Sequence, residues 1–140
     1  VVIVLMCLPI ASCKGVDKLK DDEFRIVVYN HTGEEISGVN MEYFVEDKSL
    51  GTVFVANGEK NIADKQSIYT DFNKDMFEGY PEILVQFNVK CTVTSADNKT
   101  YDCSNKMEFI AEYNNTYYYL ISGSSRTTYH LTALSSPIEE

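Results

Sequence analysis

The sequence predicts an all-β protein, a β-sandwich of about seven antiparallel strands. Apolar residues recur at every second position in segments rich in Val, Ile, Thr, Tyr and Phe, which is typical of strands with one face toward a core. Combinations of Gly, Asn, Asp and Ser separate these segments at short intervals. Helical periodicity is nearly absent after residue 23. Many short strands with closely spaced turns indicate two packed sheets.

The first two strands are predicted at residues 24–29 and 39–46, where the side chains alternate between two faces. The sequence His-Thr-Gly-Glu-Glu at residues 31–35 is a turn pattern, so we expect these two strands to form a hairpin. Two further strands are expected at residues 51–56 and 61–70, on either side of a turn at 57–60.

The clearest alternation covers residues 83–94. Its expected core face consists of Ile83, Val85, Phe87, Val89, Cys91 and Val93. Across the turn at 96–98, a register in which paired residue numbers sum to 194 places Cys91 opposite Cys103. The same register pairs Val93 with Tyr101, Phe87 with Met107, and Val85 with Phe109. Val89 would then face Asn105, and this mismatch indicates a β-bulge.

The opposed cysteines predict a cross-strand disulfide between Cys91 and Cys103, which fits an oxidising compartment. Closing a loop of this size contributes about 3 kcal/mol in the chain-entropy model. The alternative is a pair of reduced cysteines in the core.

The last two strands are expected at residues 116–122 and 127–134, joined by the turn 123–126. Because consecutive strand residues face opposite sides, a core position for Tyr117 and Tyr119 would turn Tyr118 outward, near Tyr129. Tyr118 and Tyr129 are therefore candidate aromatics for binding a partner. The alternative is that these tyrosines only favour the strand conformation.

The N-terminal segment, residues 1–12, is apolar and uncharged, as in the core of a signal peptide whose basic start is missing. It ends in Ile10-Ala11-Ser12-Cys13, which resembles the lipobox of bacterial lipoproteins. The resemblance implies cleavage before Cys13 and acylation of that cysteine, which anchors the protein to a lipid bilayer. The alternative is an ordinary secretory signal followed by an unmodified cysteine. Cleavage would remove Cys7 and leave three cysteines in the mature chain. Lipidation of Cys13 would leave Cys91 and Cys103, so that no cysteine remains without a possible disulfide partner.

Residues 13–23, with the lipidated cysteine at the start, are predicted to form a flexible charged tether, and residues 24–140 a single sandwich domain. An acidic, lysine-containing stretch after the cysteine is similar to the surface-export signals of Bacteroides-type lipoproteins. We therefore expect the protein to be anchored by lipid to the bacterial outer membrane, on either the periplasmic face or the cell surface.

Several short motifs resemble small Bacteroides-type lipoproteins of unknown function. They are the sequence IVVYNHTGEEISGV at residues 26–39, Gly58-Glu59-Lys60, and Ser67-Ile68-Tyr69-Thr70. The resemblance implies an immunoglobulin-like or transthyretin-like sandwich and no functional residues. Because the chain has no Trp, a true immunoglobulin core with Trp against a disulfide is disfavoured.

One motif has the spacing of a calcium loop, formed by Asp71, Asn73, Asp75 and Glu82. Met76 stands where that loop requires Gly, so we expect no metal, and a short helical crossover as far as Gly79 is the alternative. No cofactor motif is present.

The formal net charge of -9 disfavours nucleic acid as a partner. The two histidines, His31 and His130, have no paired ligand spacing and no nucleophile motif beside them. The sequence therefore predicts a non-enzymatic binding or assembly module of the cell envelope, with a protein or glycan partner. The alternatives are a small exported enzyme of the hydrolase type, and a secreted glycoprotein that uses the sequons at Asn30, Asn98 and Asn114.

Overall fold

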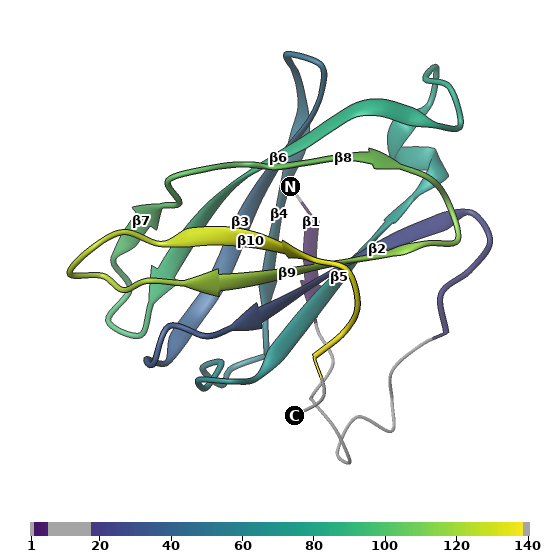
Figure 1. Cartoon of the computed structure of the whole chain (residues 1–140). Coiled ribbons are helices and arrows are strands. Elements are labelled where there is room, and N and C mark those ends of the chain that lie inside the picture. The colour runs from purple at the N-terminus through teal and green to yellow at the C-terminus, as the bar shows by residue number, and fades with distance from the viewer. Residues whose placement is uncertain (1, 6–17, 139–140) are drawn as a thin grey trace.

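The computed structural model describes residues 2–5 and 18–138, and its strands form two stacked β-sheets (Figure 1). Sheet A has the order β1-β4-β3-β6-β7, with β8 also pairing β6, and sheet B has the order β10-β9-β2-β5. The all-β sandwich is thereby confirmed. No α-helix occurs in the described part of the chain, and no helix there is long and apolar enough to cross a membrane.

The element bounds are β1 Val2–Leu5, β2 Glu23–Asn30, β3 Ile36–Val45, β4 Lys48–Ala56, β5 Ser67–Asn73, η2 Lys74–Phe77, β6 Leu84–Ser95, β7 Thr100–Asp102, β8 Met107–Ala111, β9 Thr116–Ser122 and β10 His130–Leu134. The described residues thus hold ten strands where about seven were predicted. The pairs β1·β4 and β2·β9 are parallel, so the expectation of purely antiparallel strands is wrong.

The chain crosses repeatedly between the sheets. β2 belongs to sheet B, and the next two strands, β3 and β4, belong to sheet A. β5 returns to sheet B. β6, β7 and β8 then lie in sheet A, and β9 and β10 lie in sheet B. The predicted hairpin of the first two sandwich strands is therefore wrong, because β2 pairs with β5 and β9 and not with β3. Alternation shows that a strand has a core face, but two such faces can meet across the sandwich as well as side by side within one sheet.

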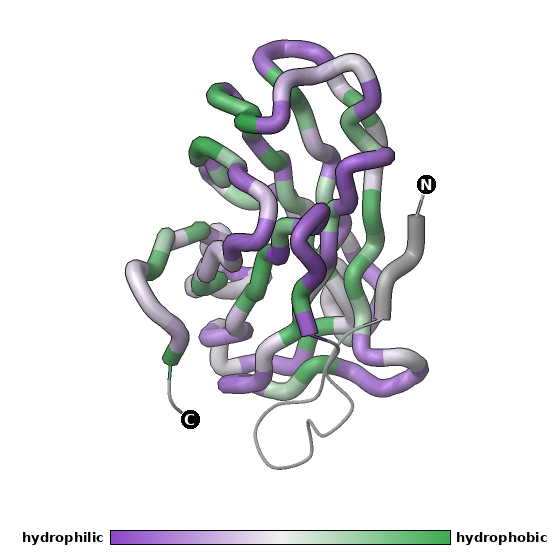
Figure 2. The backbone as a smooth tube through the Cα atoms, turned by 90° about the vertical axis from the view of Figure 1, so that its right-hand side faces the viewer, coloured by the Kyte–Doolittle hydropathy of each residue, from purple (hydrophilic) through white to green (hydrophobic). Residues whose placement is uncertain are grey.

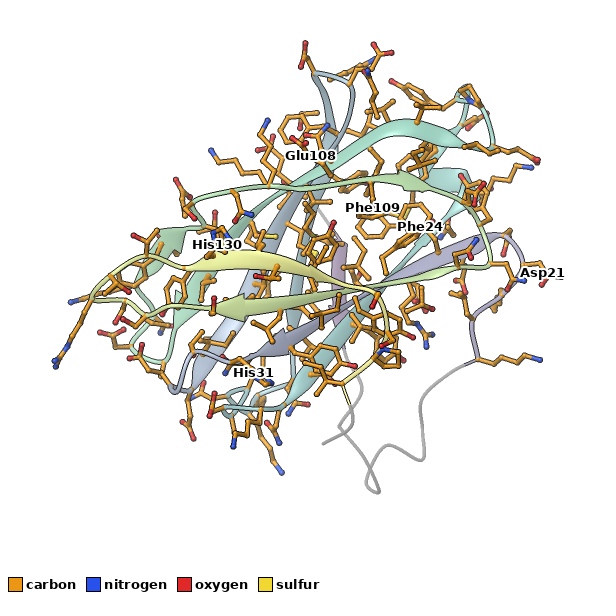
Figure 3. The ribbon with its side chains drawn as sticks, in the orientation of Figure 1. Asp21, Phe24, His31, Glu108, Phe109 and His130 are labelled. Carbon is orange, nitrogen blue, oxygen red and sulfur yellow. The ribbon has the colours of Figure 1, made fainter. Side chains whose placement is uncertain are left out.

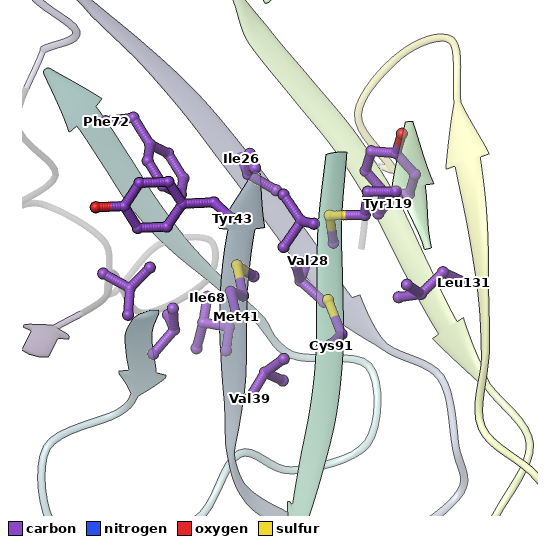
Figure 4. Packing of buried hydrophobic residues seen from close by; sticks show 14 of the residues in the cluster. Ile26, Val28, Val39, Met41, Tyr43, Ile68, Phe72, Cys91, Tyr119 and Leu131 are labelled. Carbon is purple, nitrogen blue, oxygen red and sulfur yellow. The ribbon is translucent and has the colours of Figure 1, made fainter. Parts of the chain in front are cut away.

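The core lies between the sheets and is rich in aromatic rings. Phe24 of β2 is completely buried, and its ring stacks on Phe72 at 5.2 Å and meets the edge of Phe87 at 5.1 Å. Aliphatic side chains, Met41 and Cys91 fill the middle of the sandwich (Figure 4). Hydrophobic and hydrophilic stretches alternate along the backbone (Figure 2).

The register of β6 with β7 agrees with the sequence prediction, because Val93 pairs with Tyr101 and Thr92 with Asp102. Beyond this point Val89 pairs with Met107 and not with Asn105. Phe87 pairs with Phe109, so the predicted pairs of Phe87 with Met107 and of Val85 with Phe109 are wrong. Extra residues between β7 and β8 shift the register here and let the apolar side chain of Met107 reach the core.

Cys91 and Cys103 are directly opposed, as predicted, but both are free thiols. The Cys103 N–H donates to the Cys91 carbonyl at 3.0 Å. The predicted disulfide is not formed, and its expected contribution to stability does not apply to this structure.

Asn30, at the end of β2, is buried and organises two loops. Its Nδ2 donates to the carbonyls of Glu34 at 2.8 Å, Ile62 at 3.1 Å and Ala63 at 3.1 Å. Its Oδ1 accepts from the backbone N–H and the hydroxyl of Thr32. A glycan on this nitrogen would replace these bonds, so the sequon at Asn30 is incompatible with the fold.

Candidate functional site

Three large apolar side chains are exposed at one end of sheet A. Ile83 is 49% exposed, Val85 65% and Ile110 55%. Ile83 lies just before β6, Val85 near its start and Ile110 on β8, which pairs with this part of β6. An aliphatic patch of this kind on the surface often marks an interaction site.

A β-bulge in β6 turns the side chain of Val85 toward the solvent. Leu84 pairs with Ala111, but the next regular pair is Phe87 with Phe109, so Val85 and Gln86 together occupy the irregular step and both are exposed. The predicted core face is therefore wrong at its start, because Leu84 is buried in place of Ile83 and Val85. The run Ile83-Leu84-Val85 has one apolar residue too many for strict alternation, and this was the signal in the sequence for the bulge.

The tip of the β3–β4 hairpin lies beside this bulge. The Glu46 N–H donates to the Gln86 carbonyl at 2.9 Å, and the Asn88 Nδ2 donates to the Glu46 carbonyl at 2.9 Å. Glu46 has φ 56°, in the left-handed region where a non-glycine residue is strained. The hairpin is thus held against the irregular part of β6 at the cost of a strained backbone.

Two hollows lie on either side of this contact. One has a volume of about 690 Å³ and includes Tyr80, Pro81 and Ile83 in its lining, and the other has about 430 Å³ and includes Phe109 and Ile110. Both are also lined by the same four residues, Glu46, Asp47, Val85 and Gln86. We call the two hollows with Ile83, Val85 and Ile110 the β6–β8 groove.

The charges around the groove have both signs. Glu46, Asp47 and Glu108 supply carboxylates, and Lys48 and Lys106 supply ammonium groups. Figure 3 shows Glu108 on the same strand as Phe109, whose ring faces Phe24 in the core, with the two centroids 6.4 Å apart. Apolar side chains with charges at the rim are typical of protein-binding surfaces.

The predicted aromatic pair does not form one surface. Tyr117 stacks on Phe109 at 4.2 Å and Tyr119 is buried, which confirms their core positions. Tyr118 faces outward on sheet B, between Val27 of β2 and Leu134 of β10. Tyr129 is only 1% exposed, because its ring packs inside against Tyr101, so it cannot contact a partner.

In the described residues, the three carboxylates of the calcium-like motif, Asp71, Asp75 and Glu82, do not form a group that could hold a metal ion. Asp71 accepts from Arg25, with Nε to Oδ1 at 2.6 Å and Nη2 to Oδ2 at 2.9 Å. Glu82 pairs with Lys74, and this partner lowers the pKa of its carboxyl group. Asn73 ends β5 and Asp75 lies in η2, which is shorter than the expected helical crossover because β5 continues through Asp71.

His31 follows β2 and His130 lies on β10, with β9 between these two strands (Figure 3). His130 Nδ1 is 3.0 Å from Ser104 Oγ, the distance expected for a nucleophile and its base. Ser104 and His130 are both exposed, and neither lines the hollows of the β6–β8 groove. Among the described residues, the His130 ring contacts a hydroxyl, and no hydrogen bond or ion pair joins it there to a carboxylate that would orient a catalytic base.

The two thiols are poor nucleophiles. Burial raises the pKa of Cys91 well above its usual value, with a smaller contribution from the neighbouring Cys103. Burial also raises the pKa of Cys103 to about 12, and the nearby Asp102 acts in the same direction. Since the thiolate is the reactive form, neither cysteine is suited to covalent catalysis at neutral pH. Cys13 and most of the predicted signal peptide lie outside the described residues.

The fold therefore defines an all-β sandwich domain with an exposed groove at the end of one sheet. No family model and no curated protein matches the chain. A solved NMR structure of a protein from Eubacterium rectale is similar at 13% identity and a TM-score of 0.45, over 84% of this chain and 94% of that one. Pneumolysin is similar at 6% identity and a TM-score of 0.40, over 81% of this chain and 24% of its own. Neither likeness carries a functional argument.

Proposed function

We propose that this protein is a non-enzymatic binding or assembly module of the bacterial outer membrane, anchored through acylated Cys13, and that it binds a protein partner at the β6–β8 groove. The observation that carries the proposal is the exposure of Ile83, Val85 and Ile110 together beside a strained hairpin. The described part of the chain buries 24 residues in one hydrophobic cluster and leaves these three side chains in water, which is unfavourable unless a partner covers them.

The chemistry of the groove favours a protein over a glycan. Sugars bind by stacking on flat aromatic faces, whereas the most exposed side chains here are branched and aliphatic. Such side chains pack well against apolar side chains of another protein, and the mixed charges of Lys48, Lys106 and Glu108 at the rim would select its orientation.

A site-specific cross-linking experiment tests the groove. A photo-reactive amino acid replaces Val85 in cells that make the protein, and the same amino acid replaces Leu134 on sheet B as the matched control. We expect one adduct of defined mass from Val85, its loss when Ile110→Ser is added, and no such adduct from Leu134. Equal adducts from both positions, or an adduct that persists in the Ile110→Ser chain, would contradict binding at the groove.

The anchor is tested separately by mass spectrometry of the mature N-terminus. We expect a chain that begins at an acylated Cys13, and a Cys13→Ser chain that is released from the membrane. An unmodified cysteine within an uncleaved chain would overturn the anchor and leave the groove proposal standing.

The enzyme alternative has one observation in its favour, the contact between Ser104 and His130. A Ser104→Ala chain should lose any ester hydrolysis that the wild-type chain shows in a screen of small acyl substrates. Activity that is absent from the wild-type chain, or unchanged in the variant, removes this pair from consideration as a catalytic dyad.

A further inference from the structure

The first strand of the chain occupies one edge of sheet A. β1 runs parallel to β4, from Val2 opposite Val53 to Leu5 opposite Ala56 (Figure 1). It also lies against β5, the edge strand of sheet B. β1 thus covers the side of the sandwich where the edges of the two sheets meet.

The same segment belongs to the predicted signal peptide. Cleavage before Cys13 would remove β1 and leave the outer backbone groups of residues 53–56 without their strand partner. Unpaired N–H and C=O groups along a sheet edge are a template for another strand. Val53 and Val55, which are completely buried in the structure, lie directly behind that edge.

The edge of β4 lacks the features that prevent a further strand from pairing with it. Residues 50–56 contain no charged residue and no Pro, and the irregular step of β4 lies nearer the hairpin, before Gly51. The edge strand of the other sheet, β5, carries the ion-paired Asp71. Soluble proteins usually protect a long edge with charges, Pro or a bulge, so an unprotected edge is suited to being paired.

We propose that the β4 edge is a strand-acceptor site, and that in the cleaved protein it binds an extended apolar segment of another protein, parallel to β4. β1 shows which segment fits, namely four consecutive aliphatic residues in parallel register. In the sequence the stretches 14–22 and 135–140 are charged or contain Pro137, so neither resembles β1. A different protein is therefore the donor of the strand, and binding is by addition of a strand to the sheet.

This site lies at the opposite edge of sheet A from β8, and it does not depend on the β6–β8 groove. It does depend on the predicted cleavage before Cys13. Failure of the cross-linking experiment at Val85 would leave it untouched.

The test uses the full chain with β1 disabled by Ile3→Pro and Val4→Pro, since Pro cannot donate to a neighbouring strand. The control chain carries Val16→Pro and Asp17→Pro in the tether. The probe is a fluorescent peptide of residues 1–6 with flanking lysines, and a peptide with the same two prolines is its control. We expect saturable binding of the probe to the β1-disabled chain, about tenfold tighter than to the wild-type or tether variant, and none of the proline peptide.

Amide hydrogen exchange locates the binding. The β1-facing amides of residues 53–56 should exchange about tenfold faster in the β1-disabled chain and regain protection with the probe, while β2 and β9 stay unchanged. Equal protection without β1, or equal binding to all chains, would overturn the proposal. So would a stable dimer of the β1-disabled chain through β4, because the occupant would then be a second copy.

Should the β1-disabled chain fail to fold, exchange in the wild-type chain decides. The β1-facing amides of β4 should exchange through a partial opening that leaves Val39 and Met41 of β3 protected. Exchange of these amides only on global unfolding would show that β1 does not leave the edge.

Discussion

Replacing Asn30 by Asp tests whether one buried amide holds the β2–β3 connection against the loop before β5. The change keeps the shape of the side chain and its acceptor for Thr32, but it removes the NH₂ group that donates to three carbonyls. It also places a carboxylate at pH 7 beside three carbonyl oxygens.

The expected loss of stability follows from the three hydrogen bonds that the Asn30 amide donates. The Ile62 carbonyl is bonded in a buried environment, whereas the bonds to Glu34 and Ala63 are partly buried and water can replace the donor in part. A buried acceptor left without a donor costs about 1–3 kcal/mol, so we expect Asn30→Asp to lower the free energy of unfolding by about 3–5 kcal/mol at pH 7.

The pH dependence separates this cause from a loss of packing. In the Asn30→Asp chain a protonated carboxyl group could donate one bond, so the folded state should raise the pKa of that group above the unfolded value of about 3.9. The neutral form then contributes its stability below pH about 4, and this contribution is lost as the pH rises through the folded pKa. The deficit relative to wild type should therefore be smaller at pH 4 than at pH 7.

Urea unfolding followed by circular dichroism at the two pH values measures both quantities. Asn88→Asp is the matched control, since its NH₂ also donates to carbonyls, at 2.9 Å and 3.3 Å, but in an exposed setting where we expect a loss below about 1 kcal/mol. A loss below about 1 kcal/mol for Asn30→Asp, or a deficit that is the same at both pH values, would refute the reasoning.

Three further predictions follow from the core. Phe24→Ala removes the ring at the centre of the aromatic cluster and should cost about 3–5 kcal/mol in urea unfolding, against a much smaller loss for Val27→Ala on the outer face of β2; equal losses would contradict the central role of that ring. Burial raises the pKa of Tyr119 to about 12, so its contribution to stability should be complete below pH about 10 and be lost between pH about 10 and 12; absorbance titration at 295 nm should show a late-titrating group of tyrosines that becomes smaller in a Tyr119→Phe chain, and an unchanged late group in that chain would exclude this. Cys91 should resist alkylation at pH 8 in the native protein and Cys103 should react slowly, while both react at once in denaturant, as mass spectrometry of the alkylated peptides can show; fast native labelling of Cys91 would contradict its buried position.

Much of the fold follows from local patterns in the sequence. Alternation predicts the central part of β6, and the turn after it predicts the register that opposes Cys91 and Cys103. The same parity argument places Tyr117 and Tyr119 inward and Tyr118 outward. These predictions hold because a strand with one buried face tolerates no slip of one residue without exposing its apolar side chains.

The candidate site could not be predicted in the same way. The exposure of Val85 depends on a bulge opposite β8, and the position of the β3–β4 hairpin depends on a backbone bond from Glu46 to β6. The burial of Tyr129 depends on the approach of the turn before β10 to β7, where it bridges to Cys103. Each is a contact between strands that are separate in the sequence, and periodicity carries no information about such neighbours.

The sequence by itself determined that this protein is an all-β sandwich, where most of its strands lie, and which face of the β6–β7 pair is buried, since period-two alternation and turn residues act locally. Only the tertiary structure decided that β2 and β3 lie in different sheets, that β1 pairs with β4, and that Ile83, Val85 and Ile110 remain exposed together. The physical reason is that an apolar face specifies that it must be covered, while the choice of what covers it depends on packing across the whole sandwich.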